Sequence, residues 1–341
     1  MVMHAWKRPI TALGCVLAVI SVVALSACSA SAPTDTPGAQ ATKIKLGFSA
    51  WPGWFPWQVA QEQGLFAKNN VDVEVQYFDS YTDSLNALAT GAIDANSQTL
   101  NDTLSSVSGG AKETVVLAND NSTGNDKIIA REGIASVADL RGKKVAVEQG
   151  TVDHYLLLLA LSAANLTKDD IELVPLTTDA AAAAFVAGQV DAVGAFAPFT
   201  TTALQRPGSR AVATSAEFPG AIPDHLVVTE SLAANRPDDV QKLVNTWFDT
   251  ISWIRDNKEA AYAIMAKRAG VSVDDYRTYD AGTTIFTRQQ NVDAFTPGTT
   301  PAHLNYQAGQ IADFLVTTGL VDERPALDGL LNDQFVKAVP E

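Results

Sequence analysis

Two stretches of the chain repeat one pattern of apolar and polar positions. Residues 86–95, Asn-Ala-Leu-Ala-Thr-Gly-Ala-Ile-Asp-Ala, match residues 183–192, Ala-Ala-Phe-Val-Ala-Gly-Gln-Val-Asp-Ala, at an offset of 97 positions. Each stretch predicts a helix that ends at a glycine, and then a strand entered through an aliphatic residue, an aspartate and an alanine. The chain therefore contains two related units.

The match extends outward on both sides. Strands are predicted at 44–48 and 144–147 and again at 71–75 and 171–174, with a helix between the two strands of each unit. Alternating strands and helices predict parallel strands covered by helices on both faces. The sequence thus predicts two three-layer α/β lobes; the alternative, a common helix-to-strand phrase that recurs by chance, leaves the shared order of elements unexplained.

The rest of the chain predicts one strand and then a helical tail. The strand covers 224–229, and a long amphipathic helix begins at Pro237, with apolar residues at a period near 3.6. Further helices are predicted at 259–269, 289–295 and 301–318. We expect the tail to cover the first lobe, and the chain to cross between lobes at 119–126 and 217–225. The predicted domains are residues 43–122 plus 226–341 for lobe 1 and 123–225 for lobe 2.

The first 42 residues predict export and anchoring. Lys7 and Arg8 precede an apolar run of about 15 residues, which suits a signal peptide (1–27) better than a membrane span. Leu25-Ser26-Ala27-Cys28 resembles a bacterial lipobox, which implies lipid attachment at Cys28 and an anchor on the extracytoplasmic face of the cell membrane. Residues 28–42 predict a flexible tether. The alternative is an ordinary secretory signal with an incidental cysteine.

Charge and residue counts exclude several classes of protein. Removal of the signal peptide leaves 22 basic and 38 acidic residues, a net charge of -16, which argues against a nucleic-acid partner. No cysteine follows Cys28, and the four histidines lack metal-binding spacing, so we expect no metal. The chain also lacks a nucleophile elbow, a phosphate-binding loop and a dinucleotide turn. It therefore predicts a protein that is not an enzyme, with no catalytic residue and no cofactor.

A ligand is expected at the carboxyl ends of the parallel strands, where loops and helix starts converge. The loop 49–57 brings four aromatic residues and two prolines to this edge, although Trp57 is expected in the core. Thr151 at a helix start could bind a polar oxygen or only cap its own helix, and 119–126 could be a surface turn. The predicted ligand-binding residues are Ser49, Trp51, Trp54, Tyr81, Ser97, Gln98, Asp126, Gly150, Thr151, Phe196 and Pro198.

Several of these segments together resemble one family. They are the lipobox, the loop 51–57 (Trp-Pro-Gly-Trp-Phe-Pro-Trp), the phrase Ser-Val-Ala-Asp-Leu-Arg-Gly-Lys-Lys-Val at 136–145, and 181–198. They resemble the substrate-binding proteins of ABC importers in the nitrate, sulfonate and taurine group. Where that family often has Trp-Glu-Pro or Trp-Asn-Pro, this chain has Phe196-Ala197-Pro198.

The resemblance implies a two-lobed fold of the periplasmic-binding-protein type (type II), each lobe a mixed, mainly parallel sheet flanked by helices. It implies a monomer that captures a small polar organic or inorganic solute and delivers it to an ABC permease and its ATPase. One alternative is a pyrimidine-precursor enzyme or binding protein of the thiamine-biosynthesis branch, which would imply a Cys-rich segment that is absent after Cys28. Another is a sensory or adhesive lipoprotein.

The predicted loops and crossings are acidic. They contain Asp79, Asp120, Asp126, Asp179, Glu217 and Asp224, and the nearby basic residues are Lys127 and Arg131. A bare anion would lack an arginine clamp there. The hypothesis is a ligand with a cationic or neutral nitrogen group, held by the charge of Asp126 and by aromatic faces.

The anchor gives a first testable prediction. Replacing Cys28 by alanine should release the chain from the membrane or block its maturation, because the sulfur that carries the lipid is gone. Cell fractionation and the mass of the mature chain measure this outcome. A variant that stays membrane-bound and fully processed would contradict the lipobox.

Overall fold

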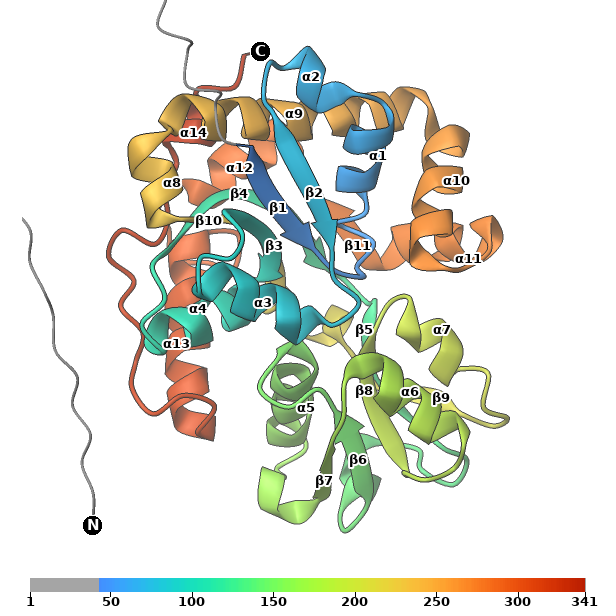
Figure 1. The fold of residues 1–341 in the computed structure, drawn as a ribbon. Coiled ribbons are helices and arrows are strands. Elements are labelled where there is room, and N and C mark those ends of the chain that lie inside the picture. Colours follow the sequence, from blue (N-terminus) through green and yellow to red (C-terminus); the bar gives the residue numbers. More distant parts are fainter. Residues whose placement is uncertain (1–42, 341) are drawn as a thin grey trace, which may run out of the picture. The chain divides into compact units, whose positions relative to one another are not determined.

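The computed structural model describes residues 43–340, and these contain two β-sheets flanked by helices (Figure 1). The predicted signal peptide, Cys28 and the tether to residue 42 lie outside the described residues. Among the helices of the described part, none is both long and apolar enough to cross a membrane.

The larger sheet has six strands in the order β11-β4-β10-β3-β1-β2. β1 (Ile44–Phe48) pairs in parallel with β2 (Val73–Tyr77) and with β3 (Ala95–Thr99). β10 (Pro223–Thr229) lies antiparallel between β3 and β4 (Glu113–Ser122), and β11 (Thr283–Ile285) pairs with the outer side of β4.

The smaller sheet repeats this arrangement with five strands in the order β7-β6-β8-β5-β9. β6 (Lys144–Val147) is parallel to β7 (Glu172–Pro175) and β8 (Ala192–Phe196), and β5 (Asp126–Ala130) lies antiparallel between β8 and β9 (Arg210–Thr214). In each sheet one antiparallel strand lies between two others: β10 in the larger sheet and β5 in the smaller one. Each of them is the first strand after the chain crosses from the other sheet. The predicted fold class, two mixed α/β sheets flanked by helices, is confirmed, although antiparallel pairings are as frequent as parallel ones in the smaller sheet and more frequent in the larger one.

The helices of the repeat also end as predicted. Gly91 follows α3 and Gly188 follows α6 with φ values of 73° and 74°, a conformation that glycine adopts without a steric penalty. The helices of the two units are α1 (Pro56–Glu62), α2 (Leu65–Lys68), α3 (Tyr81–Ala89), α4 (Leu100–Ser108), α5 (Val152–Ala163), α6 (Thr178–Val186) and α7 (Phe199–Ala203). Short 3₁₀ helices cover Val137–Leu140, Lys168–Asp170, Ser215–Glu217 and Thr278–Gly282.

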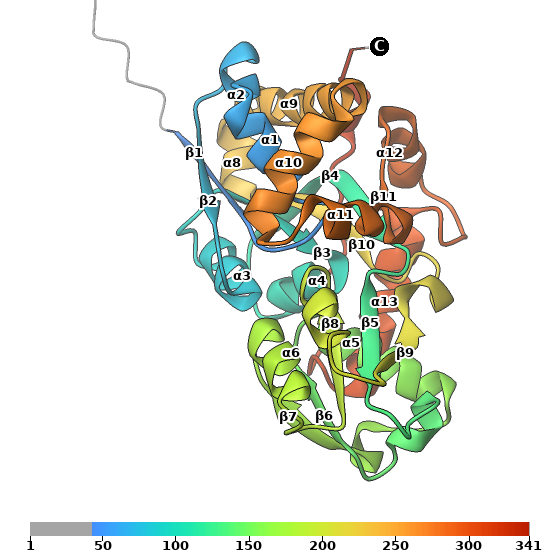
Figure 2. The same cartoon turned by 90° about the vertical axis from the view of Figure 1, so that its right-hand side faces the viewer.

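The C-terminal tail packs on the part built around the larger sheet, as expected. α9 lies beside α1, where the rings of Trp247 and Trp57 are 4.8 Å apart, and Figures 1 and 2 show α9 and α10 next to α1. α13 packs on α4 and also reaches α5, where Phe314 and Tyr155 are 5.5 Å apart. The tail comprises α8 (Glu230–Asn235), α9 (Pro237–Asp256), α10 (Lys258–Ala269), α11 (Val273–Arg277), α12 (Arg288–Phe295), α13 (Leu304–Thr318) and α14 (Gln334–Lys337).

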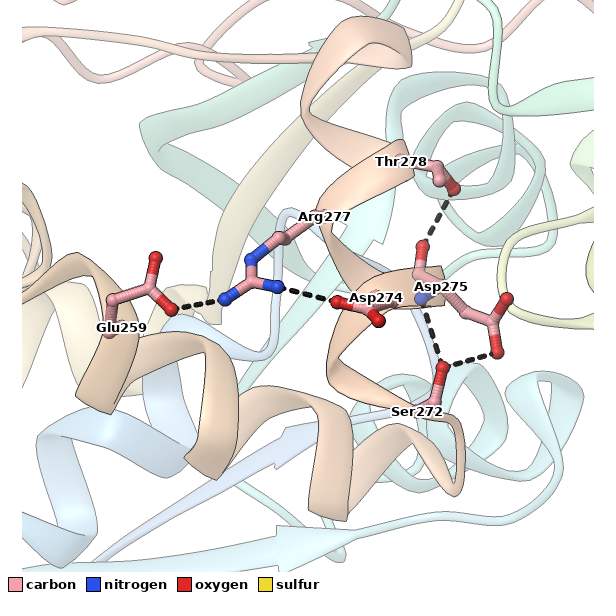
Figure 3. Close-up of polar contacts among 6 residues, drawn as sticks. All are labelled: Glu259, Ser272, Asp274, Asp275, Arg277 and Thr278. Carbon is pink, nitrogen blue, oxygen red and sulfur yellow. Dashed lines mark hydrogen bonds and ion pairs between the residues drawn. The ribbon is translucent and has the colours of Figure 1, made fainter.

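A polar network fixes the start of α11 against α10 (Figure 3). The Ser272 hydroxyl accepts from the Asp275 backbone N–H at 3.0 Å and donates to the Asp275 carboxylate at 2.7 Å. Arg277 bridges Glu259 of α10 and Asp274 of α11. Exposed ion pairs of this kind contribute little stability each, so their effect is mainly to orient α11.

That orientation matters because α11 supports the aromatic loop after β1. Tyr276 of α11 is buried, and its hydroxyl donates to the carbonyl oxygen of Pro52 at 3.1 Å. Its ring lies 5.9 Å from the ring of Phe55. α11 of the C-terminal tail therefore packs against the loop that follows β1 and supports it.

The segment 119–126 differs from its prediction. Its first four residues, through Ser122, are the end of β4 and pair with β10 on one side and β11 on the other. The chain crosses between the sheets only at 123–125. Short polar residues have low strand propensity, and tertiary pairing overrides that preference here. β4, β9 and β11 have no counterpart among the predicted strands.

The tail contact gives a second prediction. Trp247→Ala should lower the free energy of unfolding by about 3–5 kcal/mol, because it removes a fully buried ring that packs on Trp57. Urea unfolding of the purified chain measures the change. Val316→Ala, at an exposed position of α13, is the control and should change stability by no more than about 0.5 kcal/mol. Equal effects of the two substitutions would contradict the packing of α9.

Candidate ligand-binding site between the two sheets

A row of polar side chains crosses the edge of the larger sheet. Thr99 of β3 lies opposite Asp224 of β10, and Asp224 lies opposite Asp120 of β4. Residues opposite one another on neighbouring strands share a face, so the three side chains point the same way. The Thr99 hydroxyl donates to Asp224 Oδ1 at 2.8 Å, and all three residues are buried.

The smaller sheet brings a third carboxyl group and an aromatic ring to the same place. Asp126 begins β5 and lies opposite Phe196, which ends β8. Asp126 is 2% exposed and Phe196 is 4% exposed. Both sheets therefore contribute to one buried site.

Four aromatic rings form a closed circuit around this site. Trp51 is 6.4 Å from Trp54, Trp54 is 5.3 Å from Tyr81, Tyr81 is 6.1 Å from Phe196, and Phe196 is 6.4 Å from Trp51. Three of the rings belong to the larger sheet's side and Phe196 to the smaller sheet's. Widening the circuit thus means moving Phe196 away from Trp51 and Tyr81.

The circuit surrounds a narrow cavity. Its volume is about 10 Å³, which is room for about one water molecule. An adjoining cavity of similar size, between Ser49, Glu148 and Thr178, shares Ala50, Tyr81 and Phe196 with it. The first cavity is lined by the four rings and by Ala50, Thr99, Asp126, Val152, Ile222 and Asp224.

Asp120 contacts the aromatic loop 49–57 at two residues. Its Oδ1 accepts from the Trp51 indole N–H at 2.9 Å. The same carboxyl group lies against the backbone of Gly53, where a Cβ atom would overlap it. Glycine at position 53 is therefore required by the close approach of Asp120.

Burial raises the pKa values of the carboxyl groups. It raises the pKa of Asp126 to about 6, against the opposing effects of the Ser122 hydroxyl and the Lys127 charge. Burial raises the pKa of Asp120, and burial together with repulsion from Asp120 and Asp126 raises the pKa of Asp224.

Two other carboxyl groups join the sheets at helix starts. Glu148, directly after β6, accepts from the Thr82 backbone N–H of α3 at 3.2 Å through Oε1 and from the Thr178 backbone N–H of α6 at 3.3 Å through Oε2. Asp102 of α4 accepts from the Tyr81 hydroxyl at 2.8 Å and from the Val152 backbone N–H at the start of α5. One N–H group at each of these three helix starts is thus partnered by an oxygen of the protein itself.

The structure distributes the predicted site residues unevenly. Trp51, Trp54, Tyr81, Asp126 and Phe196 line the first cavity. Ser49 lines the adjoining one, and Pro198, buried, follows Phe196 at the start of α7. Trp57 is fully buried, as expected for a core residue.

The remaining predicted residues are in other surroundings. Ser97 Oγ accepts from the Trp57 indole N–H at 2.8 Å, and the Gln98 amide donates to Thr103 and Glu113. Gly150 is exposed and donates its N–H to His154 Nδ1 at 3.3 Å. Thr151 is the N-cap residue of α5, but its hydroxyl donates to the carbonyl oxygen of Glu148, so the capping bond that we considered is absent from the described structure.

The prediction did not include several residues that the structure brings to the site. The first cavity is also lined by Thr99, Asp224, Val152 and Ile222, and the adjoining cavity is lined by Glu148. The sequence indicates Asp120 and Asp224 only as acidic residues of the predicted loops and crossings. Their common row depends on β10 lying between β3 and β4, and no local pattern of the sequence carries that information.

The contact at Gly53 gives a third prediction. Gly53→Ala should shift the Trp51 fluorescence and lower the melting temperature, because the added methyl group displaces the Asp120 carboxyl group from the indole N–H. Gly309→Ala is the matched control. It lies in α13 with open space around its Cβ position, so it should be neutral or stabilise by about 0.5–1 kcal/mol. Unchanged fluorescence and melting in Gly53→Ala would contradict the contact.

Comparisons with known proteins give the chain its family. The sequence resembles a binding protein of Brucella abortus (strain 2308), with 28% identity over 265 residues that cover 76% of this chain and 81% of that protein. It also resembles the taurine-binding periplasmic protein of Escherichia coli (strain K12), with 26% identity over 273 residues that cover 76% and 82%.

The fold is that of periplasmic binding proteins. The alkanesulfonate-binding protein of Xanthomonas axonopodis pv. citri, solved with bound MOPS, superposes with a TM-score of 0.73 at 21% identity over 85% of this chain and 98% of that one. A desulfurization enzyme shares the fold with a TM-score of 0.61 at 20% identity over 86% and 98%. The sequence model of the NMT1-like family matches residues 38–270. The chain belongs to the NMT1-like family.

Proposed function

We propose that this chain is the solute-binding component of an ABC importer and that it holds a small organic solute in the cavity between its two sheets. The observation that carries the proposal is the cavity itself. Both sheets line it with buried aromatic and carboxyl side chains, and the Trp54 indole N–H and one oxygen each of Asp126 and Asp224 have no hydrogen-bond partner among the described residues. Buried polar atoms of this kind ordinarily find a partner, and a solute would supply it.

The relatives support the class of solute. Their names concern taurine and aliphatic sulfonates, which are small organic molecules with a charged group. The cavity has the aromatic and polar lining that suits such a solute. The cavity of about 10 Å³ would have to widen, by moving Phe196 away from Trp51 and Tyr81, to admit a small solute with a short apolar part.

Binding would be coupled to a relative motion of two lobes. The proposed lobes are residues 43–122 plus 226–341 and residues 123–225. Opening would separate Phe196 from Trp51 and Tyr81 and would break the hydrogen bond between Glu148 and Thr82. A solute that contacts both lobes would favour the closed state by its difference in affinity for the two states.

Delivery to a transporter completes the proposal. Lipid attachment at Cys28 would hold the monomeric protein on the extracytoplasmic face of the cell membrane, and the tether to residue 42 would let it reach an ABC permease. The ATPase of that permease would drive import. The protein itself needs no cofactor for this role.

A pyrimidine-precursor enzyme of the thiamine-biosynthesis branch is the competing function. The fold alone does not decide, since a desulfurization enzyme shares it. The sequence after Cys28 has no cysteine, so thiol chemistry is unavailable to the folded part. The named binding proteins among the relatives favour capture without a chemical step.

The test is to find the bound solute without assuming its identity. The purified chain is equilibrated with a small-molecule extract, washed and denatured, and the released molecules are identified by mass spectrometry. The retained solute should change tryptophan fluorescence and, at 100 times its dissociation constant, should stabilise the chain by about 2.7 kcal/mol. Trp54→Ala should weaken binding by about 1 kcal/mol or more, because one ring of the circuit is lost.

Trp253→Ala is the matched control, since this half-buried tryptophan of α9 is not among the residues that line the cavity. Its affinity for the solute should equal that of the unchanged chain. Equal affinity in Trp54→Ala and Trp253→Ala would contradict the proposed cavity, and conversion of the solute into a product would favour the enzyme instead.

A further inference from the structure

The cavity presents hydrogen-bond acceptors that lack donors. Asp126 Oδ2 and Asp224 Oδ2 have no partner among the described residues, although the two side chains line the cavity and are only 2% and 1% exposed. Asp120 Oδ2, in the same row, is also without a partner in the described part of the chain. An ionised carboxylate only accepts hydrogen bonds, so a molecule that satisfies these oxygens has to bring N–H or O–H groups.

No basic side chain neutralises these groups from the cavity, since none of the described residues that line it is a lysine or an arginine. Lys127 follows Asp126 directly, but its ammonium group donates to the carbonyl oxygen of Gly124. The titratable groups that face Asp126 are Asp120 from β4, Asp224 from β10, Asp153 from α5 and Lys127 from β5. Carboxyl groups therefore dominate the surroundings.

Protein oxygens occupy part of each anion site of the usual kind. Free N–H groups at helix starts attract anions, and three helices of nine residues or more begin at the interface between the sheets. Glu148 partners one N–H group of α3 and one of α6, and Asp102 partners the first N–H group of α5. An anionic solute that approached the remaining N–H groups would therefore meet a carboxyl group at each helix start.

The aromatic circuit favours positive charge independently of the carboxyl groups. Trp51, Trp54, Tyr81 and Phe196 each contact two neighbours in the circuit and all line the cavity. The faces of such rings attract cations, and cages of several rings are a known arrangement for binding them.

We infer that the cavity binds a small organic cation that carries several N–H donors, an alkylammonium or an amidinium, between Asp126 and Asp224 and inside the circuit of four rings. The inference rests on the proposed function, because it names the class of the solute. The unpartnered Trp54 indole N–H can donate to an acceptor on a larger ligand of this class, but the cation itself does not require it. A cation without N–H groups would satisfy the rings but leave the carboxylate oxygens unpartnered.

Small probes of known charge test the inference on the full chain. Methylammonium and acetamidinium carry N–H donors, tetramethylammonium is a cation without them, and ethanesulfonate is an anion. Binding is followed by the chemical shifts of the tryptophan indole N–H groups at constant ionic strength. Methylammonium and acetamidinium should bind saturably, tetramethylammonium at least tenfold more weakly, and ethanesulfonate without saturation.

Two variants assign the binding to the site. Asp126→Asn and Asp224→Asn keep the size of the side chain and remove its charge, and each should weaken acetamidinium binding at least tenfold. Asp328→Asn is the matched control at an exposed position and should bind as the unchanged chain does. Two variants are used so that a folding defect in one leaves the test intact.

The affinity for acetamidinium should fall as the pH is lowered. Acetamidinium keeps its charge throughout, whereas burial sets the pKa of Asp126 to about 6, so protonation of this group competes with the cation. Affinity should therefore be about tenfold weaker at pH 5 than at pH 7.5. An anionic ligand would show the opposite trend.

Saturable binding of ethanesulfonate that persists in Asp126→Asn would overturn the inference that the ligand is a cation. It would leave the proposed solute-binding function in place. Cation binding that is equal in Asp126→Asn, Asp224→Asn and Asp328→Asn would overturn the assigned site. Absence of binding by both N–H cations to the folded chain would overturn the inference as well. The extract experiment stays separate, because it assumes no charge for the solute.

Discussion

The N–H groups at the starts of α3, α5 and α6 are the constraint on which the rest of the site depends. Each start carries a partial positive charge and points to the interface between the sheets, where water is scarce. The chain meets this constraint with its own oxygens, those of Glu148 and Asp102. Because Glu148 links α3 of one sheet's side to α6 of the other's, the same contacts also hold the sheets together. What remains for a solute is a set of acceptors and aromatic faces, with the Trp54 indole N–H as a donor.

Burying so many carboxyl groups is costly unless protons or cations neutralise them. Burial raises the pKa values of Asp120 and Asp224, which favours their neutral forms and relieves part of the cost. Asp153 is a second case, since the single hydroxyl hydrogen of Thr178 faces both Asp153 and Glu148, and burial raises the pKa of Asp153 well above its ordinary value. Asp126 is compensated in part by the Ser122 hydroxyl and the Lys127 charge. Closure of the sheets over a cation would supply the rest, which ties the energy of closing to the presence of the solute.

Features that depend on neighbours in the sequence could be predicted, and features that depend on distant contacts could not. The repeat, the helix ends at Gly91 and Gly188, and the burial of Trp57 were predicted because each depends on neighbours in the sequence. The aromatic loop was found for the same reason. Asp224, Thr99 and Glu148 were missed as site residues because their position depends on an antiparallel strand inserted from a distance and on contacts across the interface. The polar end of β4 was predicted to be part of a crossing, with a surface turn left open, because its strand partners, β10 and β11, come more than a hundred residues later.

The residues that set the charge of the site are separable from those that make the fold. Asp120, Asp126 and Asp224 lie near the ends of strands, and Glu148 directly follows one, while the sheets behind them are built from apolar residues such as Leu46, Ile129 and Val193. A substitution at a strand end changes what the cavity attracts and leaves the packing of the sheets in place. A shared fold with proteins named for sulfonates and taurine is therefore compatible with a solute of opposite charge. The decisive chemistry lies in which carboxyl groups partner the helix starts and which stay free to meet a ligand.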